Sequence, residues 1–124
     1  MKVEAVIFDW AGTTVDYGCF APVKAFMEVF KQFGMQVTME ETREPMGMLK
    51  WDHIKTMLEM PSINQQFQTL HGRNFNHADV DEMHQQFSSR LMGILDQFVD
   101  VKPYVLDTVQ GLRDLGIKIG STTG

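Results

Sequence analysis

Two short apolar runs at opposite ends of this chain of 124 residues constrain its fold more than any other feature. The first, from residue 3, stops at Asp9, which is typical of a parallel strand covered on both faces. Residues 117–120 predict a second strand. A parallel pair needs a crossover connection, and residues 20–98 are too long for one. We therefore expect a partial α/β core, residues 1–19 and 99–124, with a helical domain, residues 20–98, inserted into it.

Apolar residues recur at helical spacing between the two runs. A first helix follows Pro22 and ends at Gly34. Thr38 and Glu41 have the spacing of a capping box, which predicts the start of a short second helix. Further helices are predicted over 47–59, around 63–70, over 80–98 and over 103–116.

Composition excludes several classes of protein. The formal net charge is −5 and no basic cluster is present, which argues against binding to nucleic acid or to an anionic membrane surface. No apolar run approaches the roughly 20 residues of a membrane span. The single cysteine, Cys19, rules out an internal disulfide. These features predict a soluble cytoplasmic protein.

Asp9 lies where open α/β sheets place their ligands, at the carboxyl end of a strand. Together with Gly12 and Thr13 it predicts an anion-binding turn, in which Asp9 acts as nucleophile, metal ligand or both, as in phosphoryl transfer through an aspartyl-phosphate. The alternative is that Asp9 only caps a turn or a helix. At position 11, where a second carboxylate would complete an acid–base pair, the chain has Ala11.

Two other segments carry chemically useful side chains. Residues 121–124 supply hydroxyls after the second strand, where they could hold phosphate oxygens. On a helix over 47–59, Met46, Lys50, His53 and Met57 would form one stripe. A lysine against apolar neighbours loses hydration, which favours the neutral amine that attacks a carbonyl to form an imine. Spacing alone favours the simpler alternative, in which Lys50 reaches solvent and His53 is an ordinary surface residue.

Three segments together resemble a known family. Residues 8–18 read Phe-Asp-Trp-Ala-Gly-Thr-Thr-Val-Asp-Tyr-Gly, residues 46–54 read Met-Gly-Met-Leu-Lys-Trp-Asp-His-Ile, and residues 120–124 read Gly-Ser-Thr-Thr-Gly. The first and last resemble two motifs of the haloacid dehalogenase superfamily, whose usual form has a second Asp in place of Ala11. Ala11 combined with a lysine in the inserted domain resembles the phosphonoacetaldehyde hydrolase family. The resemblance implies a Rossmann-like core, of which only the first two strands are present, with a helical cap domain.

The resemblance also implies roles for individual residues. Asp9 would attack phosphorus, Lys50 would form a Schiff base with the substrate aldehyde, and Mg2+ would bind the Asp9 carboxylate and the Ala11 main-chain carbonyl. A protonated imine supplies the electron sink that cleavage of a P–C bond needs. The remaining implied substrate-binding residues are Thr13 in the turn, Cys19, Met46 and His53 near the lysine, and Thr123, or less favourably Thr122, at the phosphoryl group. A homodimer through the cap is implied as well.

Other parts of the family's site, a basic residue and further acidic residues, would lie beyond Gly124. We therefore expect this chain to be an amino-terminal portion that is inactive by itself. Two alternatives stay open at this point. One is a sugar-phosphate phosphatase or phosphomutase of the same superfamily. The other is a non-catalytic helical binding or dimerisation module that keeps Asp9 only as a cap.

Overall fold

The computed structural model describes residues 2–16 and 19–122. The chain divides into two compact units. We call Met1–Ala21 with Leu95–Gly124 the α/β unit, and Pro22–Ile94 the helical unit. The division into a core and a cap with boundaries at 19/20 and 98/99 stays a prediction. Within the described ranges, no helix is long and apolar enough to cross a membrane.

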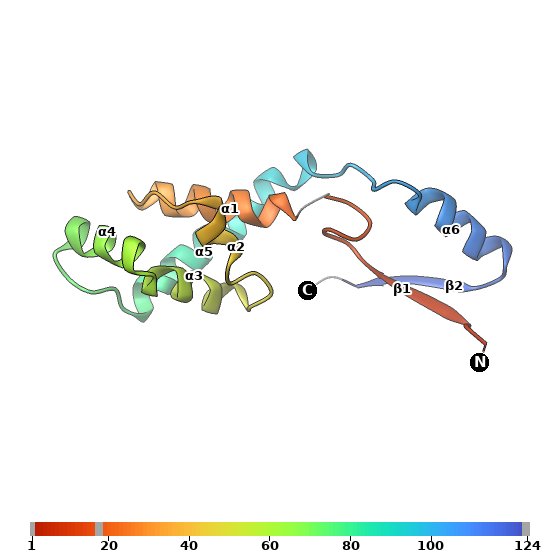
Figure 1. Cartoon of the computed structure of the whole chain (residues 1–124), viewed down its shortest axis with the longest axis horizontal. Helices are drawn as coiled ribbons and strands as arrows, with labels where there is room; N and C mark the ends of the chain where they lie inside the picture. Colours follow the sequence, from red (N-terminus) through yellow and green to blue (C-terminus); the bar gives the residue numbers. More distant parts are fainter. Residues whose placement is uncertain (1, 17–18, 123–124) are drawn as a thin grey trace. The chain divides into compact units, whose positions relative to one another are not determined.

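The α/β unit is built on a parallel pair of strands, as predicted. Strand β1 (Ala5–Asp9) pairs with β2 (Lys118–Thr122) in a register that places Ala5 opposite Lys118 and Asp9 opposite Thr122. Helix α6 (Val105–Asp114) packs along the pair (Figure 1). The carboxyl ends of both strands therefore meet at the position of Asp9.

Only one face of the strand pair is covered by the described residues. Phe8 lies half-buried on the side of α6, whereas Ile7 on the other side is 63% exposed. The half-buried positions of α6 include Val105 and Val109, as the helical spacing predicts. Helix α6 begins two residues later than expected, because Tyr104 at its N-cap has a left-handed φ of 65°.

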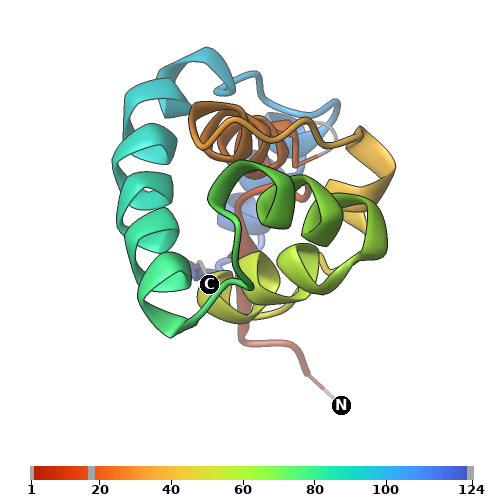
Figure 2. The same ribbon diagram turned by 90° about the vertical axis from the view of Figure 1, so that its left-hand side faces the viewer.

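The helices of the helical unit lie around one another (Figure 2). The side chains buried between them are mostly apolar. The helical unit contains α1 (Phe20–Gln32) from Pro22 onward, and all of α2 (Met39–Arg43), α3 (Lys50–Glu59), α4 (Pro61–His71) and α5 (His77–Ile94); the first two residues of α1 belong to the α/β unit. A 3-10 turn, Leu95–Gln97, follows α5. The largest fully buried apolar side chains include Phe26 and Phe30 of α1, Met57 of α3 and Met83 of α5.

Local signals fix several helix ends. The capping box is confirmed, because the Glu41 N–H donates to Thr38 Oγ1 at 3.1 Å and the Thr38 N–H donates to Glu41 Oε2 at 2.8 Å. Ser62 of α4 also donates to the Glu41 carboxylate. The hydrogen bonds from Ser62 and Thr38 lower the pKa of Glu41. One carboxylate thus caps α2 and connects it to α4.

Two predicted helices have different ends in the structure. The helix expected over 47–59 begins at Lys50, because Gly47 has a φ of +100° and Leu49, directly before the helix, has an extended ψ of 142°. Met46 therefore lies outside α3, and the predicted four-residue helical stripe is wrong at this position. The helix expected to reach residue 98 ends at Ile94 and continues as the 3-10 turn.

Candidate active site

The turn after β1 winds around one carbonyl oxygen. The carbonyl of Trp10 accepts N–H groups from Thr13, Thr14 and Val15 at 3.0, 2.9 and 3.2 Å. These N–H groups are thus engaged inside the turn instead of pointing at a ligand. Asp9 and Thr13 are exposed, so their side chains can meet an anion or a metal. We call residues 9–16 the Asp9 turn.

Gly12 gives the Asp9 turn its shape. It has a φ of +78°, and a Cβ at this position would lie 2.7 Å from Cys19 Sγ. The sulfur of Cys19 therefore packs directly against the glycine. The Gly12 N–H is shared between the carbonyls of Val15 and Asp16, at 2.8 and 3.1 Å. Only a residue without a side chain fits these constraints.

The segment 100–102 braces the Asp9 turn from a distant part of the sequence. Lys102 Nζ donates to the Gly12 carbonyl at 2.6 Å, and the Lys102 N–H donates to the Thr14 carbonyl at 2.9 Å. Val15 and Val101 form an isolated antiparallel bridge. Sequence reasoning missed Lys102, since no local pattern relates two residues so far apart. It also missed Asp16, because the first helix was expected to start after Pro22 and not at Phe20.

A cavity of about 350 Å³ lies beside Asp9 within the α/β unit. Apolar side chains of β1, β2, α6 and the segments next to them line most of it. Its polar members include Asp9, Thr14 and Ser121, which lie at or just after the carboxyl ends of the strands. The Thr14 hydroxyl donates to the Asp9 main-chain carbonyl at 3.1 Å. An apolar hollow with a few convergent polar groups is the usual form of a small-ligand site.

The oxygen atoms around Asp9 fit part of a magnesium site. Among residues 2–16 and 19–122, the Ala11 carbonyl accepts no hydrogen bond, and it lies two residues from the exposed Asp9 carboxylate. Mg2+ prefers oxygen ligands of these two kinds and keeps several waters. Within the described residues, no three His, Cys, Asp or Glu side chains cluster to hold a metal. Asp9 and Ala11 would supply two ligands of a magnesium shell, which needs further ligands.

The predicted imine-forming lysine begins helix α3 of the helical unit. Lys50 is half-buried, and the N-cap before it, Leu49, provides no side-chain hydrogen bond. His53, one helical turn later, is fully buried and stacks on Phe26 with ring centroids 3.8 Å apart. The expectation of an ordinary surface position for His53 is therefore wrong.

The environment of His53 keeps its ring neutral. Burial, with a smaller contribution from the charge of Lys50, lowers the pKa of His53 to about 4, although a hydrogen bond to the Thr42 carbonyl opposes the shift. His53 Nε2 lies 2.9 Å from that carbonyl, so the proton of the neutral ring resides on Nε2. Nδ1 is buried and has no partner among the described residues.

The predicted site residues thus fall into two groups. Asp9, Ala11, Thr13 and Cys19 surround one turn of the α/β unit. Lys50 and His53 lie on α3 of the helical unit, and Met46 precedes that helix. Thr123 lies outside the described residues, and Thr122 ends β2 opposite Asp9. Their roles toward a substrate stay predictions.

The fold and the Asp9 turn together define the class of protein. A parallel strand pair, an acid at the end of the first strand and a helical unit inserted before the second fit part of the haloacid dehalogenase core with a helical cap. A solved structure described as a phosphonoacetaldehyde hydrolase-like protein from Oleispira antarctica matches with a TM-score of 0.88 and 41% identity, over 96% of this chain and 43% of that one.

Sequence comparison with curated relatives narrows this class to one kind of enzyme that the chain resembles. Phosphonoacetaldehyde hydrolases from Lysinibacillus sphaericus and Parabacteroides distasonis are 54% and 52% identical to this chain over 124 residues. The match covers 100% and 99% of this chain but 46% and 47% of the relatives, so the chain spans about half their length. The chain is thus similar to phosphonoacetaldehyde hydrolases along its whole length. No family model matches it.

Proposed function

We propose that this chain carries part of the catalytic machinery that hydrolyses the P–C bond of phosphonoacetaldehyde to acetaldehyde and phosphate. The observation that carries the proposal is the exposed Asp9 at the carboxyl end of β1, followed by Ala11 in place of a second acid. Relatives with this activity in their names match the whole chain. A substrate whose carbon must leave as a stabilised carbanion equivalent has no use for an acid that protonates a leaving oxygen.

Lys50 captures the aldehyde in this proposal. Its neutral amine adds to the carbonyl carbon, water leaves, and a protonated imine forms two bonds from phosphorus. Lys50 lies half-buried at the start of α3, so its side chain is only partly surrounded by solvent.

Asp9 then acts as the nucleophile. Its carboxylate oxygen bonds to phosphorus while the P–C bonding pair moves into the imine, which becomes a neutral enamine. Water hydrolyses the resulting aspartyl-phosphate and releases phosphate. Protonation of the enamine carbon and hydrolysis of the imine return acetaldehyde and free Lys50. A bound Mg2+, held by Asp9 and Ala11, would neutralise charge on the phosphono group.

Borohydride trapping tests this proposal on the complete enzyme that contains this chain. With phosphonoacetaldehyde and borohydride, we expect a reduced adduct on Lys50 and loss of activity. Lys50→Met should abolish both the adduct and turnover. Lys55→Met on the same helix, which removes only an exposed partner of Glu59, is the matched control and should keep both.

Three outcomes would point elsewhere. Hydrolysis of a sugar phosphate without an adduct on Lys50 would favour a phosphatase of the same superfamily. An Asp9→Asn variant with unchanged properties would favour a non-catalytic module. An adduct on Lys55 instead of Lys50 would contradict the assigned lysine. The cytoplasmic location and a homodimer formed through the helical unit also stay proposals of the resemblance.

A further inference from the structure

We infer that Asp16 is a positioning residue for the nucleophile Asp9, an assignment that rests on the proposed function. Asp16 is 5% exposed and belongs to the chain that joins β1 to α1. A buried carboxylate is costly unless hydrogen bonds satisfy it. The contacts of Asp16 show what satisfies it and what it holds in place.

The carboxylate of Asp16 caps helix α1. Oδ1 accepts the N–H of Phe20 at 3.0 Å, and Oδ2 accepts the N–H of Ala21 at 3.1 Å. These are the first two residues of α1, whose N–H groups have no acceptor within the helix itself. The positive end of the helix dipole also favours the negative charge. Both oxygens of one side chain thus hold the start of α1.

The main chain of Asp16 holds the Asp9 turn. Its carbonyl accepts the N–H of Gly12 at 3.1 Å and that of Cys19 at 3.2 Å, and its own N–H donates to the Asp100 carbonyl at 3.3 Å. The backbone of Asp16 has a φ of 54°. This left-handed conformation is uncommon for residues other than glycine and persists where surrounding contacts enforce it.

One residue therefore couples the start of α1 to the turn that carries the nucleophile. Without the carboxylate, residue 16 would lose its hydrogen bonds to the start of α1 and could shift. The Gly12 N–H, which donates to the carbonyl of residue 16, would then shift with it. Displacements of about 1 Å are enough to slow a positioned reaction by roughly a hundredfold. Because Asp16 acts through Asp9 and does not touch the aldehyde, its removal should lower kcat and leave KM and imine formation nearly unchanged.

Two substitutions separate the side chain from the backbone. Asp16→Gly accepts the left-handed conformation without strain but has no carboxylate. Asp16→Asn also tolerates this conformation and keeps one acceptor oxygen. In the complete enzyme we expect kcat to fall by roughly 10- to 100-fold in Asp16→Gly and by less in Asp16→Asn. Borohydride trapping at Lys50 should persist in both.

The matched control is Thr38→Ala, which removes the side-chain cap of α2 in the helical unit. It should lower the free energy of unfolding by about 1 kcal/mol, a loss typical of a cap, without lowering kcat. Wild-type kcat in Asp16→Gly, or a loss explained by its unfolded fraction alone, would overturn the assignment. A rise in KM with constant kcat would overturn it as well.

A readout independent of catalysis separates this inference from the proposed function. Amide hydrogen exchange at Gly12 and Thr13 should be faster in Asp16→Gly than in the wild type, while exchange within α3 and α5 stays unchanged. If the wild-type enzyme forms no adduct on Lys50, the proposed chemistry fails. Faster exchange in the turn would then still support the structural coupling, and unchanged exchange would overturn it.

Discussion

A single hydrogen in place of a side chain decides the shape of the Asp9 turn. Gly12 combines a left-handed backbone with a sulfur atom packed against its α-carbon. Its carbonyl also accepts a hydrogen bond from the ammonium group of Lys102. Any substitution at Gly12 therefore disturbs the backbone and two contacts at once, three residues after Asp9.

We predict that Gly12→Ala destabilises the α/β unit by about 2–4 kcal/mol, since a left-handed alanine costs about 1–2 kcal/mol and the clash with Cys19 adds about 1–2 kcal/mol. Urea unfolding measures the change. Gly116→Ala is the control, because its φ is +70° but nothing lies within 4 Å of an added Cβ. It should show the backbone cost alone. Equal losses in the two variants would contradict a steric role for Cys19.

Sequence reasoning located Asp9, Ala11 and Gly12 because an apolar run, an acid and a glycine are adjacent in the chain. It could not locate Lys102, whose bond to Gly12 depends on how distant segments return to the same place. It also misjudged His53. A helical stripe shows which residues share a face, but it does not show whether another helix covers that face.

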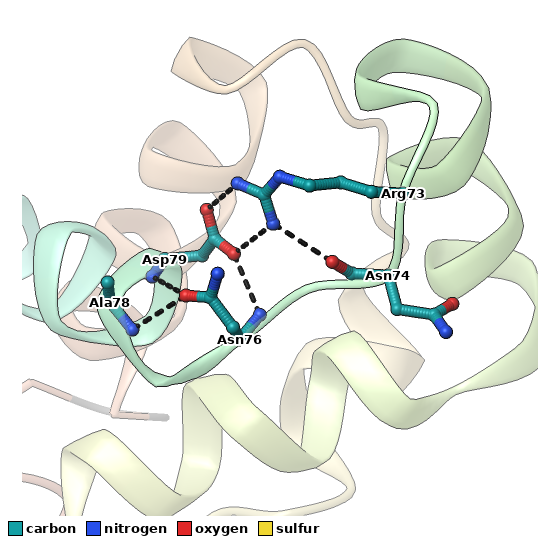
Figure 3. Close-up of polar contacts among 5 residues, drawn as sticks. All are labelled: Arg73, Asn74, Asn76, Ala78 and Asp79. Carbon is teal, nitrogen blue, oxygen red and sulfur yellow. Dashed lines mark hydrogen bonds and ion pairs between the residues drawn. The ribbon is translucent and has the colours of Figure 1, made fainter.

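At the scale of elements, the start of helix α5 shows how side chains replace missing helical hydrogen bonds (Figure 3). Asn76 Oδ1 accepts the N–H groups of Ala78 and Asp79 at 2.9 and 3.2 Å, and Asp79 Oδ2 accepts the Asn76 N–H at 2.7 Å. Arg73 forms two bonds of 2.7 Å to the Asp79 carboxylate. These contacts, chiefly that with Arg73, lower the pKa of Asp79.

We predict that Asp79→Asn lowers the free energy of unfolding by about 1 kcal/mol at pH 7, because it weakens both the cap and the ion pair. The folded state lowers the pKa of Asp79, so its stabilisation is fully present above the unfolded value of 3.8 and is lost as the pH falls through the folded value. The difference in the free energy of unfolding between the wild type and Asp79→Asn should therefore shrink below about pH 4. Arg73→Met is the control and should have the smaller effect. A difference that persists at pH 2 would contradict this account.

Apolar periodicity, with the capping box for α2, predicted the α-helices seen in the described residues, but it misplaced starts that depend on unusual backbone angles. Helix α3 starts after the left-handed Gly47, and α6 starts after the left-handed Tyr104. Apolar spacing continues smoothly across both positions in the sequence. The parallel pairing of β1 and β2 was predictable, because a long connection between two strands permits that direction.

At the scale of the whole molecule, buried His53 makes stability depend on pH. Its pKa is about 4 in the folded protein and about 6.5 when unfolded, so the unfolded chain binds the proton first as the pH falls. The contribution of neutral His53 is complete above about pH 6.5 and is lost between pH 6.5 and 4, to a total on the order of 3 kcal/mol.

We therefore predict that urea midpoints of the wild type fall between pH 7 and pH 4.5. In His53→Leu, which fills the same apolar site without a titrating group, the midpoint should change much less over this range. The change of the urea midpoint with pH that remains in His53→Leu comes from the carboxylates. Parallel curves for the two proteins would show that His53 is accessible to protons in the folded state.

The bridge between Val15 and Val101 and the hydrogen bond from Asp16 to Asp100 hold two segments side by side: the one where the chain leaves the α/β unit and the one where it returns. These contacts hold the two ends of the inserted segment together, whatever the length of that segment. Closing a longer loop adds little entropy cost, growing only with the logarithm of its length. We therefore expect the strand pair to tolerate inserted segments of very different length between residues 16 and 100.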